Sequence, residues 1–179
     1  MSLFSVFFVL FSGVGWAAPG TGGTAFPLPT QARLSEIRDL ADSFNNEDAL
    51  KATVNFRANP NLPGPAWSMK LPDGTLVVEY NPAIIDSLPH AGVDFIFFHE
   101  LGHIRLGHVN ESRTTDESGM EREFEADAFG AYIYRRFRKV DETILGFVEL
   151  LRSKAHTMPP GPERAILIES ILKEPSPIN

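Results

Sequence analysis

Two histidines and a glutamate stand in one short segment, at a spacing that could hold and use a metal ion. His99, Glu100 and His103 form an HExxH pattern in the sequence HELGH. Residues four apart lie on one face of a helix, so both imidazoles can bind the same ion. Glu100 can reach a water on that ion and act as a general base in peptide hydrolysis. The pattern therefore predicts one bound zinc ion, with Glu100 as a catalytic residue.

An acidic segment, MEREFEAD, follows at 120–127 and offers a third ligand. A catalytic zinc site takes three protein ligands and leaves its fourth position for water. Glu121, Glu123 and Glu125 compete for this role, and Glu121 and Glu125 also fit a solvated helix start. Glu123 shares a helical face with Asp127, while Glu125 points about 200° away from it. Glu123 could therefore bind the metal while Asp127 orients a ligand histidine.

The elements that must position these residues are mostly helical. Apolar residues at helical spacing predict helices over 31–44, 89–106, 120–137, 141–153 and 162–173, with Thr30 as the first N-cap. A turn signal at 72–74 precedes a predicted strand over 75–80, TLVVEY. Helices with one short sheet indicate an α+β fold. A chain of 179 residues suits one domain, which we place at 31–173, with a frayed tail at 174–179.

Composition excludes several classes of partner and site. The formal net charge is -7, which argues against nucleic-acid binding because phosphate contacts need a basic surface. The chain has no cysteine, so disulfides and thiolate metal sites are excluded. Any metal ligands must therefore be histidines and carboxylates.

The first residues predict export. An apolar run over 3–11 is followed by small residues at Gly15 and Ala17, which is typical of a signal peptide cleaved after Ala17. The run is shorter than the roughly 20 residues that span a bilayer. We expect a signal peptide at 1–17, a Gly- and Pro-rich tether at 18–30, no membrane span after cleavage, and a periplasmic or secreted protein.

The segments HELGHIRLGH and EFEAD resemble the gluzincins of the CAAX-prenyl-protease and HtpX-like group, whose signature is HExxH followed by ExxxD. ImmA-like gluzincins are a second resemblance, because the stretch between His103 and Glu123 is short. The resemblance implies that Glu123 is the third ligand and Asp127 its companion. His108, five positions after the second ligand, also recurs in periplasmic and mitochondrial relatives, and we expect it to lie behind the ligands or at the surface rather than to bind the metal.

The same resemblance implies how substrate binds. In such folds the strand before the active-site helix is an edge to which an extended substrate adds, which would assign substrate binding to Val77, Val78, Glu79 and Tyr80. Relatives often carry His-Pro-x4-Arg after the ligand helices. Here Arg164 keeps the spacing to Pro159, while the histidine, His156, stands two positions earlier than in the family.

The oxyanion of the reaction needs a donor besides the metal. His156 and Arg164 are the first candidates for this donor, with Tyr80 and Tyr132 behind them. Both tyrosines also fit the core of an amphipathic element.

Three functions remain open from the sequence. The leading prediction is an exported zinc endopeptidase that acts on a protein or peptide substrate. The second is an ImmA-like regulatory protease with one dedicated target, against which the signal peptide counts. The third is a zinc-stabilised adaptor without activity, against which Glu100 counts because a structural site needs no base.

Overall fold

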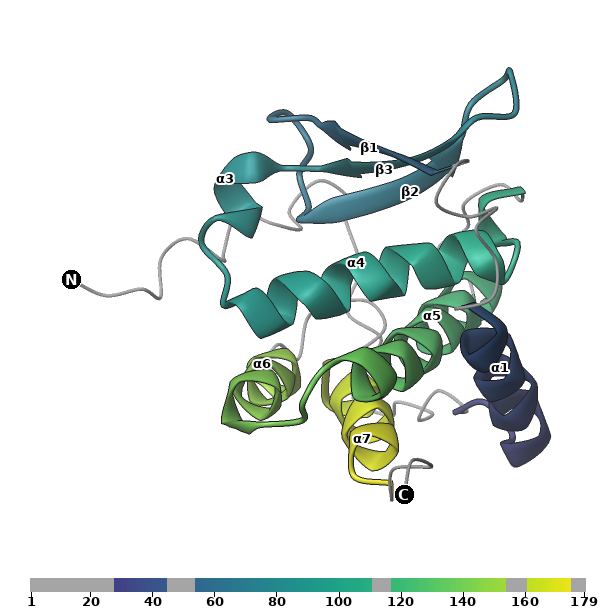
Figure 1. Ribbon diagram of the computed structural model, residues 1–179, viewed down its shortest axis with the longest axis vertical. Helices are drawn as coiled ribbons and strands as arrows, with labels where there is room; N and C mark the ends of the chain where they lie inside the picture. The colour runs from purple at the N-terminus through teal and green to yellow at the C-terminus, as the bar shows by residue number, and fades with distance from the viewer. Residues whose placement is uncertain (1–27, 45–53, 111–116, 154–160, 175–179) are drawn as a thin grey trace.

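The chain folds into a small sheet and a set of helices, with one long apolar helix between them. The computed structural model describes residues 28–44, 54–110, 117–153 and 161–174. In chain order the elements are α1 (Gln31–Ser43), β1 (Val54–Ala58), β2 (Ala66–Lys70), β3 (Leu76–Tyr80), α3 (Pro82–Ile85), α4 (His90–Arg105), the 3-10 turn η3 (His108–Asn110), α5 (Glu117–Phe137), α6 (Glu142–Arg152) and α7 (Gly161–Leu172). Figure 1 shows the sheet on one side of α4, and α5, α6, α7 and α1 on the other. The α+β fold predicted from the sequence is confirmed.

The sheet has three strands in the order β1-β3-β2. β1 runs parallel to β3, and β2 runs antiparallel to it. The prediction that β3 is an edge strand open to substrate is therefore wrong. The backbone of Val77, Val78, Glu79 and Tyr80 is already paired with β1 on one side and β2 on the other. The edge strand that packs against α4 is β2.

Aromatic side chains fix the sheet on α4. The rings of Phe56 in β1 and Tyr80 in β3 meet the ring of Phe97 in α4 edge to face, with centroids 5.6 and 5.9 Å apart. Such T-shaped contacts add to the area that aromatic residues bury. They define the face of the sheet that is turned toward α4.

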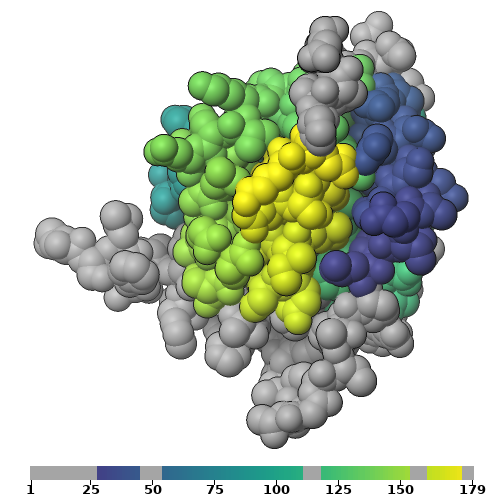
Figure 2. Space-filling view, turned by 90° about the horizontal axis from the view of Figure 1, so that it is seen from below, coloured from purple at the N-terminus to yellow at the C-terminus, as the bar shows by residue number. Residues whose placement is uncertain are grey.

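Helix α4 is apolar around most of its circumference because it is covered from two sides. A helix with no polar face is typically buried within the fold. The core lies mainly between α4 and the helices below it, where these large side chains are almost fully buried: Phe95, Phe124, Phe129, Ile133, Ile144 and Ile168. Seen from below, α7 lies between α1 on one side and the α5 and α6 helices on the other (Figure 2).

Local signals placed most helix boundaries correctly. Thr30 caps α1 by accepting a hydrogen bond from the Arg33 backbone N–H, and Asp141 caps α6 in the same manner. Gly107, at φ +83°, directly follows Leu106, the C-cap residue of α4. Glycine adopts this left-handed conformation without strain, so it is well suited to end the helix. The helix expected from residue 120 begins instead at Glu117. The short elements β1, β2 and α3 were not predicted.

Several predictions concern residues outside the described ranges. They are the signal peptide at 1–17, most of the tether at 18–30, nearly all of the tail at 174–179, and His156. Within the described part of the chain, no helix is both long enough and apolar enough to cross a membrane.

Candidate metal centre

Two glycines let α4 and α5 approach closely. A Cβ at Gly102 of α4 would lie 3.2 Å from the carbonyl oxygen of Ala126, and a Cβ at Gly130 of α5 would lie 3.1 Å from the backbone nitrogen of His99. Both distances are tighter than ordinary van der Waals contact, so a side chain at either position would push the helices apart. The close approach brings the HExxH face of α4 against the acidic face of α5.

The side chains of His99, His103 and Glu123 meet at this contact. The two Nε2 atoms lie 3.1 Å apart, and the Glu123 carboxylate oxygens lie 3.4 Å from His99 Nε2 and 3.3 Å from His103 Nε2. Tetrahedral zinc with bonds of about 2.0–2.1 Å places its ligand atoms about 3.3 Å from one another. The three donors are therefore spaced to hold one metal ion, and they are the group of described residues that could do so.

The site is buried on the histidine side and open on the glutamate side. The residue exposure of His99 is 7% and that of His103 is 6%, whereas the Glu123 side chain is 25% exposed. Burial disfavours the ionised form of Glu123, but the charges and hydrogen bonds of His103 and His99 outweigh it and hold the pKa of Glu123 well below its usual value. Glu123 is thus an ionised candidate ligand whose side chain is in part open to solvent.

Asp127 supports His99 from behind. Its Oδ1 lies 2.9 Å from His99 Nδ1, and both of its oxygens accept hydrogen bonds of 2.7 Å from Arg164. Burial alone would lower the pKa of His99, yet the hydrogen bonds and charges of Asp127 and Glu123 raise it to about 10 in the absence of a metal. The Nδ1 side of the His99 ring is thus held by Asp127, and its Nε2 atom faces the other two donors.

A second set of contacts supports His103. His103 Nδ1 lies 3.0 Å from His108 Nδ1, and His108 Nε2 lies 3.1 Å from Glu125 Oε2. Glu125 in turn accepts hydrogen bonds from Arg33 of α1, at 2.6 Å from Nε and 2.9 Å from Nη2. Burial would raise the pKa of Glu125, but its bonds to His108 and Arg33 lower the pKa to about 2. Glu125, which competed with Glu123 for the third ligand position, therefore contacts His108, the partner of the candidate ligand His103.

Glu100 lies beside the metal ligands and under the edge of the sheet. It is 6% exposed, and its Oε2 accepts a hydrogen bond of 2.7 Å from the backbone N–H of Ser68 in β2. This N–H points away from β3, toward α4. The outer edge of β2 therefore runs past the carboxylate predicted to be the general base.

The structure brings together the predicted ligands and the two predicted supports, and it gives Arg164 a contact that was not expected. Two of the guanidinium nitrogens of Arg164 bind Asp127, so Arg164 holds that carboxylate in place. Its role at an oxyanion, like that of His156, stays a prediction. Tyr132 is a core residue whose hydroxyl accepts a hydrogen bond from Arg38 at 3.2 Å.

Sequence reasoning missed Ser68 and Arg33. Ser68 lies in a short strand without clear alternation, and Arg33 is separated from Glu125 by 92 positions, so no local pattern reveals either contact. For Glu125 the sequence did offer one indication of a separate role, because helix geometry places it on the face opposite Glu123.

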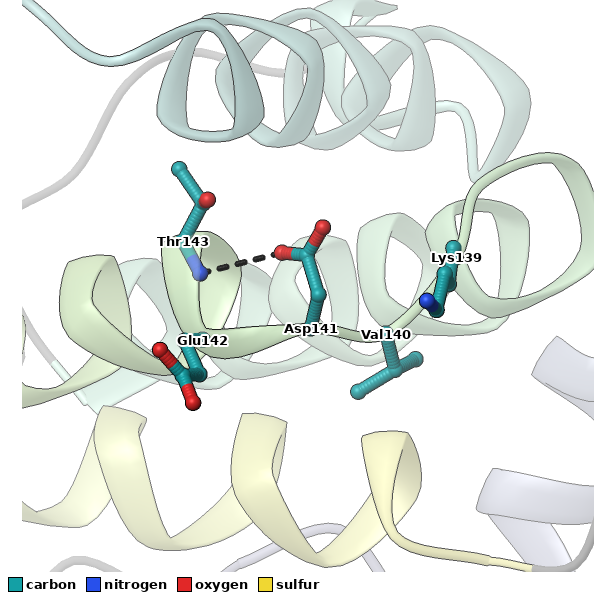
Figure 3. Close-up of a pocket in the computed structure, with 5 residues that line it drawn as sticks. All are labelled: Lys139, Val140, Asp141, Glu142 and Thr143. Atoms are coloured by element: carbon teal, nitrogen blue, oxygen red, sulfur yellow. Dashed lines mark hydrogen bonds between the residues drawn. The ribbon is translucent and has the colours of Figure 1, made fainter.

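A surface depression elsewhere carries no comparable chemistry. It is formed by the connection between α5 and α6, where Figure 3 shows these five residues: Lys139, Val140, Asp141, Glu142 and Thr143. The Asp141 carboxylate there accepts a hydrogen bond of 3.0 Å from the Thr143 backbone N–H, which is the N-cap of α6. None of the candidate metal ligands lines it, so we assign the functional site to the contact of α4 with α5.

In this α+β domain the HExxH helix meets a glutamate of the following helix, and the two histidines and the glutamate form a His₂Glu group that could hold a metal ion. The family model of Peptidase U49 matches residues 4–134, which include both ligand helices up to Tyr134. The chain belongs to the Peptidase U49 family, and it is accordingly a peptidase, a hydrolase that acts on peptides. Comparison with curated proteins and with solved structures found no match. The closer likeness to the CAAX-prenyl-protease and HtpX-like group stays a prediction.

Proposed function

We propose that this peptidase is a zinc-dependent endopeptidase of the gluzincin type, in which His99, His103 and Glu123 hold one zinc ion. The observation that carries the proposal is the spacing of the three donor atoms, 3.1 to 3.4 Å, beside a buried Glu100. Two imidazoles and one carboxylate form a set that leaves one zinc position free for catalysis.

The residues of the chain divide the chemistry between them. When bound, zinc supplies Lewis-acid polarisation of the scissile carbonyl and acidifies the attacking water. Glu100 takes a proton from that water while the oxygen of the water bonds to the carbonyl carbon. Glu100 then gives the proton to the leaving amine as the C–N bond breaks. The Ser68 N–H holds one oxygen of Glu100 and keeps the carboxylate at the site.

We propose that substrate adds to the outer edge of β2 rather than to β3. Since the Ser68 N–H points outward to Glu100, the alternation of an antiparallel ladder directs the backbone groups of Ala66 and Lys70 outward as well. An extended peptide paired to this edge would pass directly beside Glu100. The sheet therefore supports the predicted mode of substrate addition on a different strand.

The test compares zinc content and peptide cleavage in the full chain and three variants. The wild type should bind one zinc ion and cleave casein or a peptide library. Glu100→Gln should keep the zinc and lose about 10²–10⁴-fold in rate, because it removes only the general base. Glu123→Gln should lose zinc and activity together. Glu121→Gln, an exposed neighbour on the same helix, is the matched control and should keep both.

Each failure has a distinct meaning. A wild type without zinc would overturn the metal assignment. Zinc with no cleavage by the wild type would favour the adaptor, and cleavage by Glu100→Gln at the wild-type rate would exclude Glu100 as the base.

Export to the periplasm or the medium is a separate part of the proposal. It rests on the apolar run at 3–11 and the small residues before Ala18. The family match begins at residue 4, so it covers residues 4–11 of that run. Mass determination of the protein recovered from cells tests the point: a chain beginning at Ala18 supports export, and a chain that retains residues 1–17 contradicts it.

A further inference from the structure

The two ligand histidines are held by different parts of the fold. His99 is supported within the helical core, by Asp127 and Arg164. His103 is supported by a longer series of contacts that ends on α1, the first helix of the described chain. The second series is the one whose last member, Arg33, is partly exposed, with a side-chain exposure of 36%.

We propose that Glu125 and Arg33 are positioning residues for the metal ligand His103, so that α1 helps to set the metal affinity of a site built on α4 and α5. The inference rests on the proposed zinc function and deepens it. It adds to the site two residues that touch neither the metal nor the substrate.

The contacts between His103, His108 and Glu125 indicate which ring nitrogen of each histidine carries a proton. His103 offers its Nε2 lone pair to the metal, so its remaining proton sits on Nδ1 and is donated to His108 Nδ1. His108 must then carry its own proton on Nε2, which it donates to the Glu125 carboxylate. Every contact has one donor and one acceptor only in this arrangement. A carboxylate at the end therefore selects the tautomer of both imidazoles.

Arg33 fixes the carboxylate that makes this selection. Its Nε and Nη2 each donate to a different oxygen of Glu125, in the two-pronged geometry that orients a carboxylate best. Lysine could neutralise the charge but could not set the plane of the carboxylate in the same way. The guanidinium of Arg33 therefore orients the plane of the Glu125 carboxylate as well as neutralising its charge.

A simpler explanation is that Arg33 only docks α1 onto α5, and the chain offers controls for it. Arg136 of α5 binds Asp42 of α1 at 2.5 Å, which joins the same two helices away from the metal site. Arg33 also binds Glu36 of its own helix at 3.0 Å. Loss of either of these contacts leaves the contacts between Arg33, Glu125 and His108 in place.

The experiment measures the zinc dissociation constant of the full chain by competition with a chromogenic chelator. Glu125→Gln and Arg33→Gln should each bind zinc about 10- to 100-fold more weakly than the wild type, the range found when partners behind metal ligands are lost. Arg33→Lys should recover part of the affinity. The controls Arg136→Gln and Glu36→Gln should stay within about twofold of the wild type, because they leave the support of His103 intact.

A second readout follows the ligand field. The visible absorption bands of the Co²⁺-loaded protein should shift in Glu125→Gln and Arg33→Gln and stay unchanged in the two controls. If Glu125→Gln fails to fold, the two Arg33 variants decide the question, since they alter a partly exposed side chain.

The outcomes separate this inference from the proposed function. Tight zinc binding by the wild type and by both Gln variants would overturn the inference and leave the endopeptidase intact. Equal weakening by Arg136→Gln would also overturn it, in favour of simple helix docking. A wild type that binds no zinc would overturn both.

Discussion

The hydrogen-bonded ion pair of Arg164 and Asp127 is expected to contribute strongly to the stability of the fold, because Asp127 is fully buried. Asp127 is 0% exposed and accepts hydrogen bonds from Arg164 on both oxygens, at 2.7 Å each. The charges of Arg164 and His99 hold the pKa of Asp127 below its usual value even though burial alone would raise it. Arg164→Gln would leave a buried carboxylate with one partner, His99.

The expected cost can be estimated from this geometry. Removing one partner of a buried ion pair costs about 3–5 kcal/mol, because the remaining charge is stranded away from water. His99 keeps one of the three hydrogen bonds, so we expect the lower end, about 3 kcal/mol. A domain with about 5–15 kcal/mol of total stability would lose a large share of it.

Urea unfolding of the metal-free protein at pH 7 tests this estimate. The matched control is Arg152→Gln, which removes an arginine whose partner Glu169 lies at the surface, with side-chain exposures of 34% and 26%. Exposed pairs are worth about 0–1 kcal/mol, so the control should be nearly neutral. Equal losses in the two variants, or a loss below about 1 kcal/mol in Arg164→Gln, would refute the argument that Asp127 depends on Arg164.

Two further predictions concern packing and pH. Gly130→Ala should destabilise the fold by about 1–3 kcal/mol because its Cβ would press on the backbone of α4. Gly146→Ala, in α6 with no atom within 4 Å, should instead stabilise it by about 0.5–1 kcal/mol; the same sign in both thermal-unfolding measurements would contradict the close approach of α4 and α5. Hydrogen bonds from Asn59 and, to a lesser extent, Arg57 lower the pKa of Glu79 in the folded protein below its ordinary value of 4.5. The charge of Glu79 therefore stabilises the fold above pH 4.5, and this stabilisation is lost as the pH falls through the lowered pKa of the folded state. Glu79→Gln should therefore cost about 1 kcal/mol at pH 7 and progressively less below pH 4.5, and a pH-independent difference would exclude this linkage.

The local parts of the site could be predicted from residue spacing along the chain. His99 and His103 share a helical face because of their spacing alone, and Glu123 and Asp127 do so for the same reason. The helix boundaries followed from caps such as Thr30, which act on the next few residues. The class of fold followed from the same periodicities, since helical spacing dominates the chain.

The residues behind the candidate ligands, and the strand that borders the site, could not be predicted in this way because they depend on how distant segments pack together. Strand order depends on pairing between segments that are distant in the chain. The sequence of an apolar strand such as β3 therefore does not indicate whether the strand lies at the centre of a sheet or at its edge. Arg33 and Glu125 are 92 positions apart, and Arg164 and Asp127 are 37 apart. Side chains at such separations meet because packed helices bring them together, so a local sequence pattern cannot predict the contact.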